Sequence, residues 1–179
     1  MAKIVYACVR DTSSTPLIKK RIELVIPKLV PDNIPNAKCK VVENNGVVYG
    51  ISTYSARISE IEDSVCMGIA YNSAGKWWEP GTGLPEGSYA IFRADEAYVE
   101  AITDIACSRA VWYYKDDDLF VAGPSQRASH CLDAGPSDRF PSGQNSNSEK
   151  ARRPTPRYLR NAVLFGRFAM RKTRQLTQA

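Results

Sequence analysis

The sequence is poor in histidine, has no Cys-x-x-C pair and contains no apolar run near the roughly 20 residues that a membrane-spanning helix needs. With His130 as the single histidine and five scattered cysteines, no zinc-site spacing is present. The amino end has no long apolar segment ahead of a small-residue cleavage site, so no secretory signal is predicted. We therefore expect a cytoplasmic protein. Its cysteines should be reduced and structural, with Cys8, Cys66 and Cys107 buried in strand-like runs.

Acidic and basic residues are unevenly distributed along the 179 residues. From Cys131 onward, ten basic and three acidic residues give a charge of +7, and because the whole chain carries +5, residues 1–130 carry −2. The pI of about 9.0 therefore belongs to the carboxyl-terminal part. The 44% hydrophobic content indicates one globular domain, which we expect over residues 1–128, followed by a basic tail over 129–179.

Strand-like runs dominate the expected domain, which predicts an α+β protein. Strands are predicted over residues 3–9, 38–43, 47–54, 64–71, 88–93, 98–105, 109–114 and 119–122. Asn45-Gly46 and the acidic run 116–118 are typical of hairpin turns. One short helix is predicted to begin with Thr15 as its N-cap and to end at Pro27. Its buried stripe is predicted to comprise Leu17, Ile18, Ile22 and Val25.

The stretch 84–128 resembles the end of the glutaminase domain of asparagine synthase and other class II glutamine amidotransferases. In that family a Leu-x-Gly-x-Phe-Ala-like strand precedes an Arg-Asp-x-x-Gly-x-Arg-Pro-Leu-Tyr-Tyr-like element, and a Phe-Ala-Ser-Glu-like strand closes a hairpin. The corresponding residues here are Leu84, Gly87, Tyr89 and Ala90, then Asp104, Arg109, Val111, Trp112 and Tyr113, then Phe120, Val121 and Ala122. The resemblance covers about a quarter of the chain.

The resemblance implies the four-layer αββα sandwich of N-terminal-nucleophile (Ntn) hydrolases. It also implies ATP- and glutamine-dependent amidation of aspartate or a related acid in the full-length family, with ATP and Mg²⁺ bound by a separate synthetase domain. That domain needs a Ser-Gly-Gly-x-Asp-Ser pyrophosphate loop, which this sequence lacks, so no cofactor is expected in this chain. A separate synthetase domain or a second copy of the chain is the partner that we expect.

Two departures from the family pattern predict that glutamine is not turned over. The family's nucleophile is a cysteine at the first position of the mature chain, but here residue 2 is Ala2 and the first cysteine is Cys8, inside a strand. The family's Asn-Gly-Glu motif, which helps to form the oxyanion hole, is reduced to Asn72 followed by Ser73 and Ala74. We assign no catalytic residue, and Asn72 stays the one weak candidate for substrate binding.

For the other aromatic and charged residues that could form a site, the sequence predicts structural roles or none. Trp77 and Trp78 are predicted to cover an edge of the core rather than to stack on a ligand. The carboxylates of 116–118 are expected in a solvated turn, because three neighbours in a tight turn cannot converge on one cation. Asp104 and Arg109 are predicted to form a structural pair, and His130 has no partner that indicates a catalytic triad.

The basic tail, residues 129–179, predicts an alternative function. Residues 133–156 are rich in Pro, Ser, Gly and Asn and are predicted to be disordered, whereas residues 158–176 have the pattern of a basic amphipathic helix. Such a helix is typical of binding to nucleic acid or to an anionic membrane, which would make this a small non-enzymatic binding protein. A tail that is a non-native ending of a truncated, degenerate gene would have the same abrupt change of composition.

Overall fold

The first strand lies at the centre of its sheet. The computed structural model describes residues 3–34, 37–53, 57–71, 76–126 and 168–169. β1 (Lys3–Val9) is buried along almost its whole length, as its apolar sequence predicts. It pairs antiparallel with β3 (Val47–Thr53) on one side and with β9 (Leu119–Gly123) on the other. Strands from both ends of the domain therefore meet at β1.

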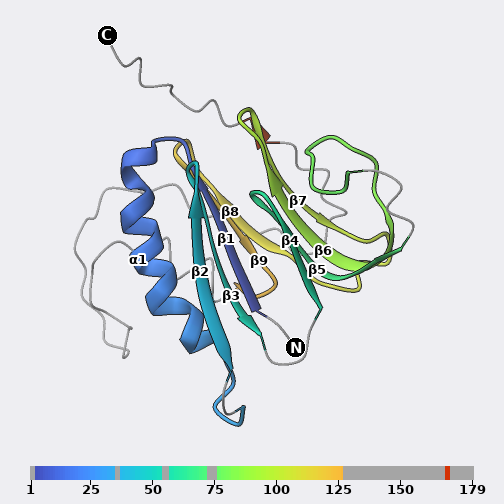
Figure 1. Cartoon of the computed structure of the whole chain (residues 1–179), viewed down its shortest axis with the longest axis horizontal. Coiled ribbons are helices and arrows are strands. Elements are labelled where there is room, and N and C mark those ends of the chain that lie inside the picture. The colour runs from blue at the N-terminus through green and yellow to red at the C-terminus, as the bar shows by residue number, and fades with distance from the viewer. Residues whose placement is uncertain (1–2, 35–36, 54–56, 72–75, 127–167, 170–179) are drawn as a thin grey trace, which may run out of the picture.

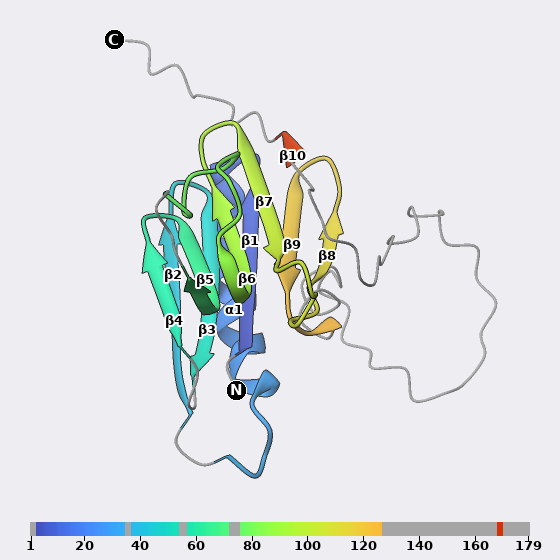
Figure 2. The ribbon, with the colours of Figure 1, turned by 90° about the vertical axis from the view of Figure 1, so that its right-hand side faces the viewer.

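Two five-stranded antiparallel sheets make up the domain. Sheet 1 has the order β2-β3-β1-β9-β8, with β2 (Lys38–Asn44) and β8 (Trp112–Lys115) at its edges. Sheet 2 has the order β10-β7-β6-β5-β4. Its strands are β4 (Ile58–Ile61), β5 (Ser64–Tyr71), β6 (Glu86–Ala94), β7 (Tyr98–Thr103) and β10 (Phe168–Ala169). Figures 1 and 2 show the two sheets stacked face to face.

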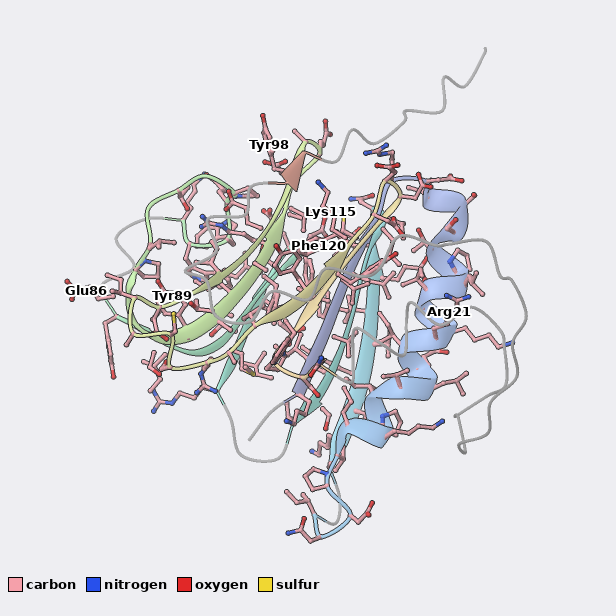
Figure 3. The ribbon with its side chains drawn as sticks, turned by 180° about the vertical axis from the view of Figure 1, so that it is seen from behind. Arg21, Glu86, Tyr89, Tyr98, Lys115 and Phe120 are labelled. Atoms are coloured by element: carbon pink, nitrogen blue, oxygen red, sulfur yellow. The ribbon has the colours of Figure 1, made fainter. Side chains whose placement is uncertain are left out.

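One helix covers the outer face of sheet 1 (Figure 1). A 3₁₀ turn, η1 (Thr12–Ser14), leads into α1 (Thr15–Val25), and a second 3₁₀ turn, η2 (Ile26–Leu29), follows it. The side chains of Ile18, Ile22 and Val25 are buried against the sheet because they recur at helical spacing. Figure 3 shows Arg21 on this helix, far from Tyr89 of sheet 2.

Apolar side chains fill three layers. The layer between the sheets is built from alternate residues of the facing strands, among them Tyr6, Tyr49, Phe92 and Phe120. The opposite face of β1 packs on α1. A third cluster covers the outer face of sheet 2, where the segment 76–84 lays Trp77 over Tyr89 and Ile91. A helix therefore covers one sheet, and a loop covers the other.

The prediction of a strand-rich α+β protein is confirmed, and so are the bounds of β1 and β5. The Asn45-Gly46 hairpin is confirmed as well, with φ of 44° and 80° as a tight turn of this kind requires. β4 was not predicted. Residues 109–111, expected at the start of a strand, precede β8 instead.

Two details of the helix prediction are wrong. Thr15 is the first helical residue rather than the N-cap, because the chain enters the helix through η1 and Ser14 takes the capping position. Leu17 is 54% exposed, since it lies one position away from the stripe that faces the sheet. Within the described residues, no helix is both long and apolar enough to cross a membrane.

At the carboxyl end, the described residues are Phe168 and Ala169, which form β10. These two residues are in a strand rather than in the helix predicted over 158–176, because they pair with the edge of β7. The predicted disorder of residues 133–156 and the other residues of the predicted helix lie outside the described part of the chain.

Candidate functional site

The loop after β7 contains a carboxylate, Asp104, that accepts several hydrogen bonds within the motif region, residues 84–128. The Asp104 carboxylate accepts hydrogen bonds from the backbone N–H of Tyr89 at 3.0 Å and of Ser108 at 3.2 Å, and from the Ser108 hydroxyl. Ser88 lies 2.8 Å from the Ser108 hydroxyl and donates to it, since the Ser108 proton is directed at Asp104. Asp104 thereby ties the loop to the start of β6.

These contacts decide what Asp104 can do chemically. Burial by itself raises the pKa of Asp104, but hydrogen bonds from Ser108, Tyr89 and Ala106 outweigh it and hold the pKa below the usual value. A carboxylate that is stabilised in its ionised form is a weak general base. The row from Ser88 through Ser108 to Asp104 is therefore suited to fixing the loop rather than to activating a hydroxyl.

Backbone geometry in the same region is special at two positions. Gly87 has φ of 151°, and a Cβ added there would lie 2.1 Å from the carbonyl oxygen of Ile69 on the neighbouring strand. Cys107 has φ of 50°, in the left-handed region that non-glycine residues seldom adopt. Its N–H donates to the Asp104 carbonyl at 2.9 Å, which closes the turn. Cys107 thus lies in this turn, and the prediction of a buried strand residue is wrong for it.

Arg109 does not pair with Asp104 in the described part of the chain, so that prediction is wrong. Asp104 uses its oxygens on backbone and hydroxyl donors of the same end of sheet 2. The Nε of Arg109 is buried, has no hydrogen-bond partner among the described residues, and lies close to the backbone of Gly68. Its positive charge acts on Cys66, where it partly opposes the effect of burial.

The described cysteines are free thiols, as predicted. Cys8 is 1% exposed and lies between Val47 and Phe120, inside the layer between the sheets. Burial raises the pKa of the Cys66 thiol to about 11, so this thiol is protonated at neutral pH. Cys39 is exposed on the edge strand β2. Neither buried thiol is accessible to a substrate, and the Cys66 thiol is also protonated at neutral pH.

A buried ion pair fixes the loop over sheet 2. The Arg93 Nε lies 2.7 Å from Glu100 Oε2 on the neighbouring strand. The same guanidinium donates to the Trp77 carbonyl at 2.8 Å and to the Thr82 carbonyl at 3.0 Å. Sequence reasoning missed this network, although one signal was available: Arg93 continues the apolar face of Tyr89 and Ile91. A charged residue on a buried face needs a partner.

The predictions for the loop and turn residues are confirmed. Trp77 is 8% exposed and covers the third core cluster, with Trp78 packed edge-on at 5.9 Å between ring centroids. Asp116 accepts hydrogen bonds from the N–H groups of Asp118 and Leu119, which is the contact pattern of a solvated hairpin turn. Asn72 and His130 lie outside the described residues.

A cavity of about 410 Å³ opens at the other end of β6. It lies between the β2–β3, β4–β5 and β6–β7 turns. Its described lining residues are Thr12, Asn45, Glu62, Asp63, Ala94, Asp95 and Glu96. Four of these are acidic and none is basic. The described residues contain no group of three His, Cys, Asp or Glu side chains that would hold a metal ion.

No family model matches the chain, and no curated protein or solved structure is detectably similar to it. A family assignment therefore depends on the motif residues and on their geometry. Within the described part, the loop formed by residues 104–109 and its contacts with β6 are the features that link the sequence motif to a specific place in the fold.

Proposed function

We propose that the domain is a class II glutaminase-like domain of the asparagine synthase type that has lost glutaminase activity. In this role it is a scaffold that docks beside a synthetase domain, and it does not release ammonia itself. The layers support the proposal: two stacked antiparallel sheets with a helix on one outer face are compatible with an αββα sandwich. The outer face of sheet 2 differs from that architecture, because the loop 76–84 covers it instead of a helix.

The observation that carries the proposal is the backbone of the motif region. The family pattern Arg-Asp-x-x-Gly-x-Arg puts a glycine at the position of Cys107, and Cys107 has the left-handed φ that glycine favours. The pattern Gly-x-Phe-Ala puts a glycine at Gly87, where a side chain would collide with β5. Asp104 joins these two elements through its bond to the Tyr89 N–H. At both positions where the family motif has glycine, 87 and 107, the backbone thus has a positive φ that glycine adopts more easily than other residues.

The placement of the thiols supports the loss of activity. In the family the nucleophile precedes the central strand, whereas Cys8 lies near the end of β1 with its side chain in the core. The other buried thiol, Cys66, has a pKa raised to about 11 and faces the loop 76–84. Neither sulfur can contact the side-chain amide of glutamine while the opposite sheet covers Cys8 and the loop 76–84 covers Cys66.

Ammonia release from glutamine tests the proposal. The purified full chain is expected to release no more ammonia than an enzyme-free blank, because Cys8 and Cys66 are buried and Ala2 stands where the family has its nucleophile. The Cys8→Ser variant is the control. Turnover that is present in the unchanged chain and absent in Cys8→Ser would show that Cys8 is a nucleophile and that the domain is an active glutaminase.

The proposed domain acts in a reducing compartment and beside a partner. Free Cys8, Cys39, Cys66 and Cys107 fit a reducing compartment, so we place the domain in the cytoplasm. ATP and Mg²⁺ would be bound by the synthetase partner, because in the family the pyrophosphate loop Ser-Gly-Gly-x-Asp-Ser lies in that domain. A second copy of the chain stays an alternative partner. Binding of nucleic acid or an anionic membrane through the tail stays a prediction, because only residues 168–169 of the tail are described.

A further inference from the structure

β10 adds a strand from the carboxyl-terminal part of the chain to the edge of sheet 2 (Figure 2). Phe168 pairs with Val99 and Ala169 pairs with Tyr98, in antiparallel register. Strand addition at a sheet edge fixes both the position and the direction of the added segment. Because the pairing is antiparallel, each step forward from Phe168 corresponds to one step back from Val99. The direction of β10, from Phe168 to Ala169, is therefore toward the β6–β7 turn.

The charges on the two sides of this junction are opposite. The residues that follow β10 include Arg171, Lys172 and Arg174, and the sequence has no acidic residue after Ala169. The β6–β7 turn contains Asp95 and Glu96, which line the acidic cavity together with Glu62 and Asp63. None of the described lining residues is basic. The charged residues of the segment 170–174 are thus all basic, whereas the charged described residues that line the cavity are all acidic.

The distance is short enough for contact. Arg171 is three residues beyond Phe168, and Glu96 is three residues before Val99, so a continuation of the same register would place Arg171 opposite Glu96. Two extended residues beyond Ala169 span at most about 7 Å. Figure 3 shows Tyr98, the partner of Ala169, at this end of sheet 2. No long or folded linker is needed between the paired strand and the cavity.

We propose that the acidic cavity is the docking site for this chain's own residues 170–174, held there by β10. Asp95 stabilises the turn by accepting hydrogen bonds from the N–H groups of Ala97 and Tyr98, both at 2.7 Å. Glu62, Asp63 and Glu96 supply the further negative charge that attracts the basic segment. Because the segment is tethered two residues away, its effective concentration at the cavity is high, and individually weak ion pairs are sufficient.

Hydrogen–deuterium exchange of the full chain tests this docking. The readout is the protection of the peptide that contains Phe168 and Ala169, which is protected only while β10 is paired. In the double variant Arg171→Glu/Lys172→Glu, exchange of this peptide is expected to be about tenfold faster, because repulsion from the cavity opens the pairing. The matched control is Arg152→Glu/Arg153→Glu, which makes the same change of charge away from β10 and is expected to exchange like the unchanged chain.

A charge swap completes the experiment. Adding Glu62→Lys and Glu96→Lys to the Arg171→Glu/Lys172→Glu variant is expected to restore protection, since attraction is re-established with reversed signs. High salt is expected to weaken protection in the unchanged chain. Equal exchange in the unchanged chain and the Arg171→Glu/Lys172→Glu variant would overturn the proposal, and so would equal acceleration in the control. Failure of the charge swap to restore protection would also overturn it. None of these outcomes depends on glutaminase activity.

Discussion

Arg93 and Glu100 face each other across β6 and β7 and form an ion pair that is almost completely shielded from solvent. The Nε to Oε2 distance is 2.7 Å, and the two side chains are 2% and 9% exposed. Glu100 also accepts from the Gly81 N–H at 3.1 Å, while Arg93 donates to the carbonyl oxygens of Trp77 and Thr82. One pair of charges therefore holds two strands and the covering loop together.

Removing one partner of this pair is expected to be costly. Glu100→Ala leaves the Arg93 charge buried without a counter-ion, which should lower the free energy of unfolding by about 3–5 kcal/mol. Urea denaturation followed by tryptophan fluorescence measures this change. Glu79→Ala is the control, because Glu79 pairs with Lys76 at 2.6 Å in an exposed position and should cost less than about 1 kcal/mol. Similar losses for the two variants would contradict the assigned role of the network.

Gly87 is expected to tolerate no side chain. A Cβ at this position would lie 2.1 Å from the Ile69 carbonyl oxygen, and φ of 151° is unfavourable for alanine. Gly87→Ala should therefore destabilise the domain by about 2 kcal/mol or more. Gly83→Ala is the matched variant, because a Cβ at Gly83 meets no atom within 4 Å. Thermal and urea unfolding of the two variants should separate them clearly, and equal stabilities would contradict the close approach of β5 and β6.

Cys107 provides a test of the motif itself. If the turn needs a left-handed residue, Cys107→Gly should leave the free energy of unfolding within about 0.5 kcal/mol, since relief of backbone strain offsets the greater freedom of the unfolded chain. Cys107→Val should lower it by about 1–2 kcal/mol, because a β-branched residue is poorly accommodated at φ of 50°. Urea unfolding ranks the variants. A valine variant as stable as the glycine variant would remove the backbone argument for the family resemblance.

Asp104 should make stability depend on pH in the acid range. Its pKa is lower in the folded chain than in the unfolded chain, so the ionised carboxylate stabilises the fold. This contribution is fully present above the unfolded value of about 4 and is lost as the pH falls through the folded value. The stability difference between the unchanged chain and Asp104→Asn is therefore expected to be largest at neutral pH and to shrink below about pH 4.

Urea unfolding at a series of pH values measures this difference. Asp117→Asn is the control, because Asp117 is exposed in the β8–β9 turn and its replacement should have little effect at any pH. A difference between the unchanged chain and Asp104→Asn that stays constant from neutral pH into the acid range would show that the negative charge of Asp104 is not what holds the loop.

Local sequence patterns predicted those elements whose cause is local. The Asn45-Gly46 turn and the strands β1 and β5 each follow from neighbouring residues, and each is confirmed. β4 was missed because its four residues, Ile-Ser-Glu-Ile, give too short a pattern. Leu17 was misplaced because one step along a helix turns a side chain by about 100°.

The site was harder to predict because its contacts join distant parts of the chain. Asp104 was predicted to pair with Arg109, but its hydrogen-bond partners are Tyr89 and Ser108. Which of the three donor residues, Tyr89, Ser108 or Arg109, reaches Asp104 depends on the turn at Cys107. The left-handed conformation of this turn cannot be predicted from the sequence, because cysteine seldom adopts it. Glu100 was not identified at all, since its burial results from a loop that folds over it from elsewhere.

The central position of β1 also has a consequence for how the domain reaches its native state. β1 is synthesised before both of its neighbours in the sheet, and one of them, β9, begins only at Leu119. During synthesis, more than a hundred residues must follow β1 before it can pair with β9. Such long-range pairing predicts folding on the millisecond-to-second timescale, with the nascent chain exposed to chaperones until β9 leaves the ribosome.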